Sequence, residues 1–580
     1  MPVHNIEIAT IFDHVADLLE IEDANRFRVR AYRNAANTIR DLSRSVENML
    51  EEGEDLSDLP DIGEDLAGKI AEIVRTGQLP LLDDISDKVP DAIVEATRIP
   101  GIGPKRAKAL FEAMDLSSVD DLKQAAEDGR IAKIDGFGEK TQARICQELE
   151  EGMVADERIR LDIAEDFAKP LLEWIREIEG VSKAEIAGSY RRRKETVGDL
   201  DILVQGEDGA SIIDAFTGYD EVDEIASKGK TRSTVTLRSG LQVDLRVIPK
   251  PSWGAALHYF TGSKSHNIAG RRCAQDRDLK LNEYGLFNGE KRIAGATEQD
   301  IYDGIDLPWI DPVLRENRGE IEAAEKGELP ELVKPGDIKG DLHAHTTASD
   351  GKNSLKEMAQ AAKEKGYEYL AITDHSKSQT QAGGLSEDAL HRQIDDIAAL
   401  NEELDGIRLL ASCEVDILGD GTLDFPDALL ERLDLVVASV HSKLDLAEDK
   451  QTERVIRAMD NPLVSIIGHP TGRQIGERKS FALDMERLLK AANDRGCVLE
   501  LNANPVRLDL KDVHCRMAVK KGVGIAISTD AHSTGGLDNM RFGVDQARRG
   551  WLSADDIVNT RSWGNLSKML RRGRGKGGQR

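Results

Sequence analysis

The first part of the chain carries apolar residues at the spacing of an α-helix. Within residues 5–20 these residues are Ile8, Ile11, Val15, Leu18 and Leu19. They recur every three or four positions, which places them on one helical face. We therefore expect residues 1–84 to form a domain of short helices, and residues 85–150 to form a second helical domain.

Two apolar stretches further along are each interrupted by acidic residues. Residues 199–204 read DLDILV and residues 241–248 read LQVDLRVI. Their apolar and β-branched residues favour strands. Because side chains at i and i+2 of a strand point to the same face, Asp199 and Asp201 are predicted to project together. We expect residues 151–250 to form a domain with a mixed sheet and helices.

From residue 340 onward, short apolar stretches alternate with amphipathic helical ones. The strand candidates lie around Leu342 and at residues 370–372, 409–413, 435–440, 464–467, 498–502 and 524–528. Repeated strand-then-helix units favour a parallel sheet. The number of units predicts a (β/α)7 barrel over residues 340–570.

The whole chain is predicted to be multidomain, because 580 residues are too many for a single core. Residues 251–316 are expected to form a smaller closing domain. Residues 317–339 are polar and contain Pro and Gly, which is typical of a linker or a short helix between domains. Residues 571–580 form a basic, glycine-rich tail.

Composition excludes some classes of protein. No apolar run is long enough to span a membrane, and the N-terminus has no basic-then-apolar signal pattern, so we expect a cytoplasmic protein with no membrane partner. The cysteines show no C-x-x-C spacing; they are Cys146, Cys273, Cys413, Cys497 and Cys515. We expect them to be reduced core residues rather than disulfides or zinc ligands.

Residues 186–204 combine a Gly-Ser turn, a basic run and the two aspartates. Two carboxylates held close together repel each other unless a cation lies between them, and a divalent metal is the usual solution. A third carboxylate, Asp244, on a neighbouring strand would complete a site for two metals. The turn at Gly188 and Ser189, with the arginines after it, suits a polyphosphate. The pattern predicts metal-assisted nucleotidyl transfer.

These features resemble the family X DNA polymerases, the DNA polymerase beta group, and residues 259–263 match that family's YFTGS segment. The resemblance implies Mg²⁺ or Mn²⁺ at Asp199, Asp201 and Asp244, with Asp244 as general base. It also implies nucleotide contacts from Gly188, Ser189, Arg192, Gly198, Tyr259, Phe260, Gly262 and Asn267, and a template contact from Arg271. Two positions depart from the family pattern: Val197 replaces a triphosphate-binding serine, and Lys264 replaces an aspartate near the base.

Turns that contain Gly-x-Gly or a related sequence recur between predicted helices, at residues 59–70, 99–107 and 134–141. They resemble helix-hairpin-helix motifs, in which free N–H groups at the next helix's start face a DNA phosphate. The DNA-binding residues expected from this resemblance are Gly63, Gly101, Gly103, Lys105, Gly136 and Gly138. Contacts of this kind hold DNA without reading its sequence.

The first of these turns raises the question of a lyase activity. In the family, the helix after it carries a lysine that attacks an abasic sugar phosphate as a Schiff base, and Lys69 matches this position. Arg28 and Tyr32 match other residues of that pocket. The neighbouring acidic residues Glu64 and Asp65 oppose a deprotonated lysine. Catalysis by Lys69 and a solvated helix lysine are therefore both left open.

Net charge bears on the expected DNA binding. The formal net charge is −28, whereas nucleic-acid-binding proteins usually have basic surfaces. One hypothesis is a cytoplasm of molar salt, in which an acidic surface stays soluble and charges are strongly screened. The other is an ordinary acidic protein whose basic groups are local.

Histidines and carboxylates gather at the ends of the predicted barrel strands, where catalytic groups of such barrels collect. They are His343, His345, Asp350, His375, Glu414, His441, His469, Asp530 and His532. Six of the twelve histidines in the chain are in this set, whereas core packing would scatter them. The pattern predicts a metal-binding basin.

This set resembles that of the PHP (polymerase and histidinol phosphatase) family, phosphoesterases with a trinuclear site in a seven-stranded barrel. The resemblance assigns His343, His345, Glu414 and Asp530 to one metal, and Glu414, His441 and His469 to a second. It assigns Asp350, His375 and His532 to a third. Imidazole and carboxylate ligands together suit Zn²⁺, Mn²⁺ or both.

Together the two resemblances cover nearly the whole chain, in the order of the prokaryotic family X polymerases that carry a PHP domain. They imply a repair polymerase that fills short DNA gaps, as in base excision repair, and a 3′-5′ exonuclease that could also remove 3′-phosphates or cut at abasic sites. The expected partners are gapped or primed DNA and dNTPs, and the expected state is a monomer. The alternatives are a DNA-targeted phosphoesterase with a weak or inactive polymerase half, a non-catalytic scaffold at DNA gaps, and template-independent transfer.

Overall fold

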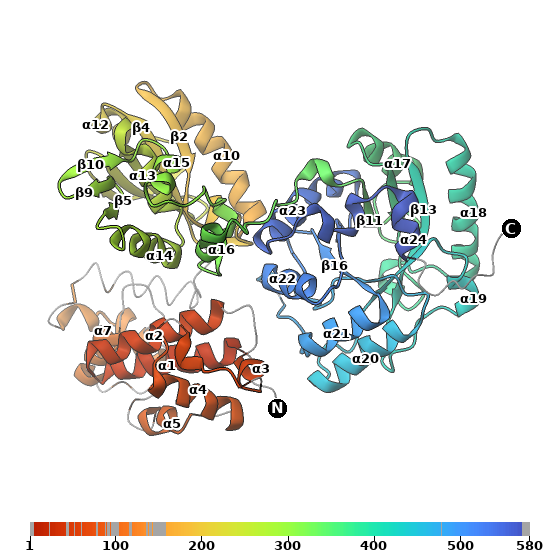
Figure 1. Cartoon of the computed structure of the whole chain (residues 1–580), viewed down its shortest axis with the longest axis horizontal. Coiled ribbons are helices and arrows are strands. Elements are labelled where there is room, and N and C mark those ends of the chain that lie inside the picture. The colour runs from red at the N-terminus through yellow and green to blue at the C-terminus, as the bar shows by residue number, and fades with distance from the viewer. Residues whose placement is uncertain are drawn as a thin grey trace. The chain divides into compact units, whose positions relative to one another are not determined.

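The computed structural model describes residues 158–476 and 478–570 and, before them, residues 5–22, 24–41, 46–51, 53–59, 61–76, 79–86, 89, 93, 104–114, 116, 119–134, 137–138 and 142. Contacts divide the chain into two compact units, residues 1–157 and residues 158–580. The parts are coloured along the chain in Figure 1.

The N-terminal unit is helical where it is described. Its helices are α1 (Asn5–Ile21), α2 (Arg26–Asp41), α3 (Val46–Glu51), α4 (Glu64–Thr76), α5 (Pro80–Ser86), α7 (Pro104–Met114) and α8 (Val119–Glu127). The predicted stripe of α1 is confirmed, because Ile8, Val15, Leu18 and Leu19 are at most 1% exposed. Helix α2 packs on this face, with the ring centroids of Phe12 and Tyr32 5.2 Å apart.

The second unit begins with the mixed sheet, which we call the palm. Its strands are β2 (Val181–Ile186), β4 (Asp199–Gly206), β5 (Val222–Lys228), β6 (Arg232–Leu237) and β7 (Gln242–Ile248), in the order β2-β4-β7-β6-β5. Strands β4 and β7 run parallel, and the other pairs run antiparallel. The helices are α10 (Leu161–Glu177), α11 (Gly188–Arg191) and α12 (Gly209–Phe216), and β1 (Ile159–Arg160) pairs with β3 (Thr196–Val197) beside the sheet.

The segment after the palm forms a smaller domain, which we call the thumb. It contains α13 (Trp253–Thr261), α14 (Lys264–Gln275), a three-stranded sheet of β8 (Lys280–Asn282), β9 (Gly285–Asn288) and β10 (Lys291–Ala294), and α15 (Glu298–Gly304). The polar segment 317–339 includes the short helix α16 (Glu320–Lys326). Ile321, Ala324 and Leu332 of this segment are buried in the thumb core, so the segment is packed against the domain.

The remainder is a nearly closed parallel barrel. Its strands are β11 (Gly340–Ala344), β12 (Tyr369–Ile372), β13 (Arg408–Asp416), β14 (Leu435–Ser439), β15 (Ile466–Ile467), β16 (Val498–Asn502) and β17 (Ile525–Ser528), paired in chain order. The helices are α17 (Leu355–Glu364), α18 (Glu387–Glu403), α19 (Asp427–Leu430), α20 (Glu448–Asp460), α21 (Met485–Arg495), α22 (Asp512–Lys520), α23 (Met540–Arg549) and α24 (Trp563–Leu570). A bridge between Ala344 and Ala531 joins the first strand to the segment after the last one.

The seven predicted strands are all present, so the predicted fold class is confirmed. All residues of the barrel strands except Arg408 are buried, and most strands are largely apolar, as expected where helices cover a parallel sheet. A parallel strand needs a crossover connection, and the intervening helices supply it. The carboxyl ends of the strands therefore lie at one end of the barrel.

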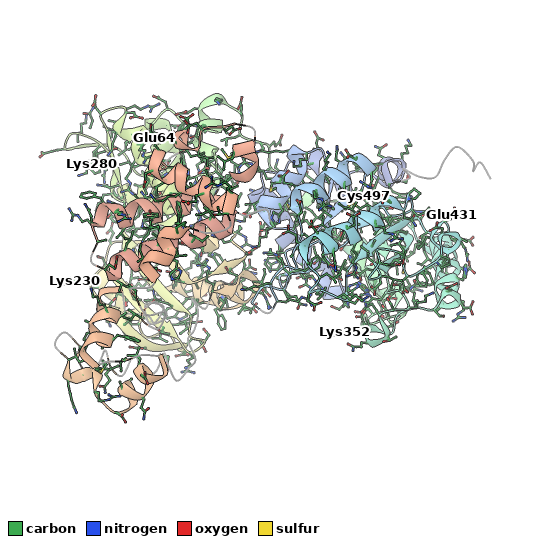
Figure 2. All side chains as sticks on the ribbon, turned by 90° about the horizontal axis from the view of Figure 1, so that it is seen from below. Glu64, Lys230, Lys280, Lys352, Glu431 and Cys497 are labelled. Atoms are coloured by element: carbon green, nitrogen blue, oxygen red, sulfur yellow. The ribbon has the colours of Figure 1, made fainter. Side chains whose placement is uncertain are left out.

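Lys352 and Glu431 are exposed on the surface of the barrel domain, while Cys497 is buried in its core (Figure 2). Cys273, Cys413, Cys497 and Cys515 are buried and free, which confirms the expectation for these four; Cys146 lies outside the described residues. Within the described parts of the chain, no helix is both long enough and apolar enough to cross a bilayer.

Candidate active sites

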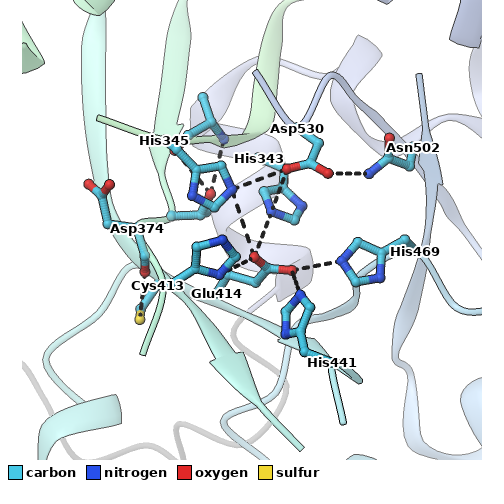
Figure 3. A network of polar contacts seen from close by, with 12 residues as sticks. His343, His345, Asp374, Cys413, Glu414, His441, His469, Asn502 and Asp530 are labelled. Atoms are coloured by element: carbon cyan, nitrogen blue, oxygen red, sulfur yellow. Dashed lines mark hydrogen bonds and ion pairs between the residues drawn. The ribbon is translucent and has the colours of Figure 1, made fainter. Parts of the chain in front are cut away.

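Glu414 lies at the centre of a histidine cluster at the carboxyl end of the barrel (Figure 3). Strand β13 carries it inward, and its side chain is 1% exposed. The nearest ring nitrogens belong to His375 and His469, each 2.9 Å from a Glu414 oxygen. His441 follows at 3.3 Å, His343 at 3.5 Å and His345 at 3.7 Å. One carboxylate therefore lies near five histidines, which come from the ends of four other strands.

The other predicted ligands extend the cluster on two sides. Asp530 Oδ1 lies 3.1 Å from His345 Nε2 and 3.6 Å from His343 Nε2. Asp350 Oδ2 lies 3.5 Å from His375 Nε2 and 3.4 Å from His532 Nε2. The nine residues expected from the sequence are thus brought together in one basin.

Three groups in this basin have ligand atoms close enough to share an ion. They are His345, Asp350, His375 and His532; His343, His345 and Asp530; and His375, Glu414 and His441. This grouping differs in detail from the division expected from the resemblance, because His345 and His375 each reach two groups. The histidine rings lie between neighbouring carboxylates, so the ligand sets overlap.

The electrostatics of the basin suit cations. Burial alone would raise the pKa of Glu414, but His441, His343 and His375 outweigh it and hold this pKa well below its usual range. His343 Nε2 lies between Glu414 and Asp530 and, among the described residues, makes no hydrogen bond, although it is buried. A buried polar atom normally has a partner. The residues present therefore fit a group of metal ions.

An outer layer of polar residues orients these side chains. Glu500 Oε1 lies 2.7 Å from His343 Nδ1, and Asp416 Oδ1 lies 2.6 Å from His441 Nδ1. Asn502 donates to Asp530 Oδ2 over 3.1 Å. Carboxylates in such places fix the tautomer and direction of a ligating histidine. Sequence reasoning missed Glu500, Asp416 and Asn502. The sequence pattern that could have found them is a pair of polar residues two positions apart in an apolar strand: Glu414 with Asp416, and Glu500 with Asn502.

The palm brings the three predicted aspartates together. Asp199 and Asp201 lie on β4, and Asp244 lies on the adjacent strand β7, directly opposite Asp201 in the register. Asp244 accepts hydrogen bonds from Thr234 over 2.6 Å and from Gln242 over 3.0 Å. Burial and the carboxylates of Asp199 and Asp244 raise the pKa of Asp201 to about 7. A cation among the three would relieve this repulsion.

The Gly-Ser turn lies directly beside these carboxylates. A Cβ atom at Gly188 would be 2.5 Å from Asp201 Oδ2, and the backbone there has φ +60°, so only glycine fits. The hydroxyl of Ser189 is buried and makes no hydrogen bond to any residue that the structure describes. Gly198, near the start of β4, lies close to Arg158, whose Nη1 would be 3.2 Å from an added Cβ. The turn therefore presents an unpaired hydroxyl near the carboxylates.

The predicted nucleotide-binding residues of the thumb cluster around the end of α13. Arg192 donates to the Thr261 carbonyl over 2.6 Å, and a Cβ atom at Gly262 would lie 3.2 Å from Arg192 Nη1. The Tyr259 and Phe260 rings meet edge to face at 5.1 Å. Asn267 donates to the Tyr259 carbonyl over 2.6 Å, while its own Oδ1 is buried and accepts no hydrogen bond from a described residue.

The other predicted positions near the nucleotide occupy different surroundings. Arg271 Nε donates to the Asn267 carbonyl over 3.2 Å, one turn along α14. Val197 is fully buried in the palm core, where it cannot replace a serine contact. Lys264 is exposed at the start of α14.

The N-terminal unit contains part of the predicted DNA-binding set. Gly63 precedes α4 and has open space where a side chain would lie, as has Gly138. Lys105 lies in the first turn of α7. The remaining predicted positions, Gly101, Gly103 and Gly136, lie outside the described residues.

The predicted lyase residues lie on α2 and α4. Lys69 forms an ion pair with Asp65, one turn earlier on α4. Its Nζ lies 6.0 Å from the ring centroid of Tyr32, whose hydroxyl is buried and has no hydrogen bond within the described parts of the chain. Arg28 is exposed. Lys69 and Tyr32 are thus neighbours, and catalysis by Lys69 stays a prediction.

Family models match successive parts of the chain. They describe a helix-hairpin-helix domain at residues 3–79, a SAM-like helix-hairpin-helix tandem at 93–151, a DNA polymerase beta palm at 158–238, a DNA polymerase beta thumb at 256–316 and a PHP domain at 341–504. A relative matches along nearly the whole chain. The DNA polymerase/3′-5′ exonuclease PolX of Bacillus subtilis (strain 168) is 36% identical over 574 residues, which cover 98% of this chain and 100% of that protein. The chain belongs to the PolX family.

Membership of the PolX family confirms both resemblances inferred from the sequence. Shorter relatives are also found. A probable phosphatase of Thermoanaerobacter sp. (strain X514) is 30% identical over 231 residues, which cover 38% of this chain and 89% of that protein. A probable phosphatase of Acetivibrio thermocellus is 34% identical over 201 residues, which cover 33% of this chain and 78% of that protein. Polymerases of this type and PHP enzymes depend on metal ions, which agrees with both carboxylate-rich sites.

Proposed function

We propose that this PolX-family enzyme is a DNA-directed DNA polymerase that fills short gaps during repair, and that its barrel is a metal-dependent 3′-5′ exonuclease. One observation carries the proposal: the chain holds two separate metal-type sites. Asp201 and Asp244 face each other beside a glycine turn in the palm, and the histidine basin lies at the end of the barrel. Each site has the residues that its own chemistry needs.

In the palm, Asp199, Asp201 and Asp244 would hold Mg²⁺ or Mn²⁺, which would supply positive charge to the transferring phosphoryl group. Ser189 and Arg192 would bind the triphosphate, with Gly188, Gly198 and Gly262 allowing its close approach. Tyr259, Phe260 and Asn267 would position the sugar and base, and Arg271 would meet the template strand. Asp244 would accept the proton of the primer 3′-hydroxyl. The unpaired hydroxyl of Ser189 supports its role.

In the barrel, the nine basin residues would hold Zn²⁺ or Mn²⁺, with three ions as the expected number. These ions would polarise a phosphodiester and lower the pKa of a water molecule. The basin residues themselves orient the ions, and the outer layer orients the basin residues. Arg507, whose Nε lies 3.5 Å from Asp530 Oδ2, supports an anionic substrate here because its Nη1 is buried and makes no hydrogen bond to the residues described. Removal of 3′-phosphates and cutting at abasic sites would use the same chemistry.

Replacing Glu500 by Gln is expected to weaken metal binding in the barrel by about tenfold to a hundredfold. Glu500 accepts from the His469 backbone N–H over 2.6 Å and contacts His343 Nδ1, so its charge supports two predicted ligands. Calorimetric titration of the metal-free protein with Mn²⁺ measures the metal affinity of each variant. The exposed Glu431→Gln is the matched control. Equal affinity in both variants would contradict a supporting role for Glu500.

The helix-hairpin-helix parts would hold the DNA backbone around a gap, through the glycine turns and Lys105. We further propose that the enzyme acts as a monomer in the cytoplasm. The basic tail would add weak affinity for DNA. If the charge of −28 reflects a cytoplasm of molar salt, activity should be highest near that salt concentration.

The test is a labelled primer on a duplex with a one-nucleotide gap, incubated with dNTPs and Mn²⁺ from low to molar KCl. We expect filling of the gap when dNTPs are present and shortening of the 3′ end when they are absent. Shortening without filling at any salt concentration would leave a DNA-targeted phosphoesterase. The absence of both reactions would indicate a scaffold. Extension of single-stranded primers at the same rate as gapped DNA would indicate template-independent transfer.

A further inference from the structure

The turn that follows Ser189 is anchored by charged residues on two sides. On the thumb side, Arg191 pairs with Glu298 over 2.7 Å and Arg192 pairs with Glu316 over 3.0 Å. On the barrel side, Arg193 pairs with Asp545 over 2.6 Å, and Glu195 pairs with Arg473 over 2.6 Å. These four pairs connect the palm to two other domains within five consecutive residues. We call residues 191–195 the basic turn.

One barrel residue, Arg549 at the end of α23, reaches Arg192 in two ways. Its Nη1 donates to the Arg192 backbone carbonyl over 2.7 Å and to Glu316 Oε1 over 3.1 Å. The same Glu316 oxygen accepts from Arg192 Nε. The Nη2 atom of Arg549 donates to Asp512 over 2.9 Å. Arg549 thus contacts the main chain of Arg192 directly and its side chain through one shared oxygen.

These contacts are buried, which strengthens the hydrogen bonds between the charged groups. The side chain of Arg549 is 3% exposed and that of Glu316 is 10% exposed. Burial would raise the pKa of Glu316, but Arg549, Arg192 and Lys194 lower it to about 2. An ionised carboxylate in such surroundings holds its arginines at defined angles, since charge-assisted hydrogen bonds strengthen away from water.

The apolar contacts between palm and barrel keep this arrangement rigid. Leu508 and Phe542 of the barrel are each 3% exposed and belong to the same hydrophobic cluster as the palm core. Phe542 lies on α23, two turns before Arg549. The barrel therefore offers a packed support behind the basic turn.

We propose that Arg549 is a positioning residue for nucleotide binding: the barrel domain holds Arg192, through Arg549, where the polymerase site needs it for the triphosphate. The inference rests on the proposed function, because it takes Arg192 to be a triphosphate contact. It adds that the polymerase half depends on a barrel residue that lies outside the metal basin. The barrel then serves two reactions: it carries out 3′-5′ shortening in its own metal basin, and it holds Arg192 in place for the polymerase reaction of the palm.

The test compares Arg549→Ala and Arg549→Lys with a matched control, Arg548→Ala. Arg548 precedes Arg549 on α23 and also links barrel to thumb, through Asp311 over 2.6 Å, but contacts no residue of the basic turn among its hydrogen bonds to described residues. Single-nucleotide gap filling gives kcat and the KM for dNTP. Binding of a fluorescent dNTP to the enzyme on DNA with a 3′-dideoxy primer gives the dNTP affinity without chemistry. The rate at which single-stranded DNA is shortened reports whether the barrel is folded.

We expect Arg549→Ala to weaken dNTP binding and raise KM by about tenfold or more, with kcat changed less. Arg549→Lys should show a smaller rise, because an ammonium group cannot meet three acceptors in a fixed fork. Arg548→Ala should stay within about twofold of wild type, and all three should shorten DNA normally.

Several outcomes would overturn the inference. One is an unchanged dNTP affinity in both Arg549 variants. Another is a fall in kcat and melting temperature at unchanged KM, which a purely structural role would give. If Arg549→Ala does not fold, Arg549→Lys decides by the same measurements. A wild-type enzyme that binds dNTP but fills no gap would contradict the proposed function alone, while the binding measurement would still test Arg549.

Discussion

Asp201→Asn is expected to reduce gap filling by about a thousandfold or more and to leave shortening of 3′ ends intact. Asp201 faces Asp244 across neighbouring strands, and an amide cannot replace a carboxylate that shares a divalent ion. Single-turnover extension of a gapped primer measures the loss. The matched control is Asp223→Asn, an exposed aspartate on β5 of the same sheet. Normal filling by Asp201→Asn would remove the palm site from the mechanism.

The same variant should be more stable than wild type when a chelator keeps metal away. Since burial, Asp199 and Asp244 raise the pKa of Asp201 to about 7, the ionised form is disfavoured in the folded palm at pH 8. Replacing it with a neutral amide removes that cost, and the melting temperature should rise by about 3 °C. The gain should shrink as the pH falls toward the ordinary aspartate pKa, because Asp201 is then protonated in the folded state. A lower melting temperature at pH 8 would contradict this electrostatic explanation.

Glu414→Gln is expected to have the opposite selectivity, reducing shortening of 3′ ends by about a thousandfold or more while gap filling continues. Five histidines surround Glu414, and its negative charge lies at the centre of the basin. Without it, neighbouring ions would repel each other. Metal content by mass spectrometry should fall relative to wild type and to the exposed Glu431→Gln. Full metal content with full exonuclease activity would exclude Glu414 as a shared ligand.

The two variants together separate the reactions. Loss of filling alone in Asp201→Asn and loss of shortening alone in Glu414→Gln would establish two independent active sites. Loss of both reactions in either variant would instead indicate that one site serves both. The Arg549 variants are expected to give a third result: the substitution lies in the barrel, but only the polymerase reaction is affected.

Local patterns were sufficient for most of the fold and for the residues that collect at the two sites. The barrel strands are short apolar runs between helices, and all but β16, which ends at Asn502, carry or are closely followed by a predicted histidine or carboxylate ligand. The palm aspartates lie two positions apart on one strand. Both patterns depend on neighbouring residues in the chain, since strand alternation and strand ends are local properties.

Other features depended on contacts between distant residues. Glu500 supports His343 across 157 positions, and no spacing rule connects them. The ligand groups overlap because His345 and His375 follow adjacent strands and each belongs to two of the groups. The segment 317–339, with the composition of a linker, is packed because its few apolar residues find a core in the thumb.

By itself, then, the sequence predicted the domain order, the strands of the barrel and the residues that the structure brings together at the two proposed sites. These follow from chemistry repeated at short spacing. The tertiary structure alone decided how the ligands are shared, which residues orient them, and that Arg549 of the barrel reaches Arg192 of the palm, 357 positions earlier. The physical reason is that such contacts arise only when separate elements pack together, and burial then makes each charge require its partner.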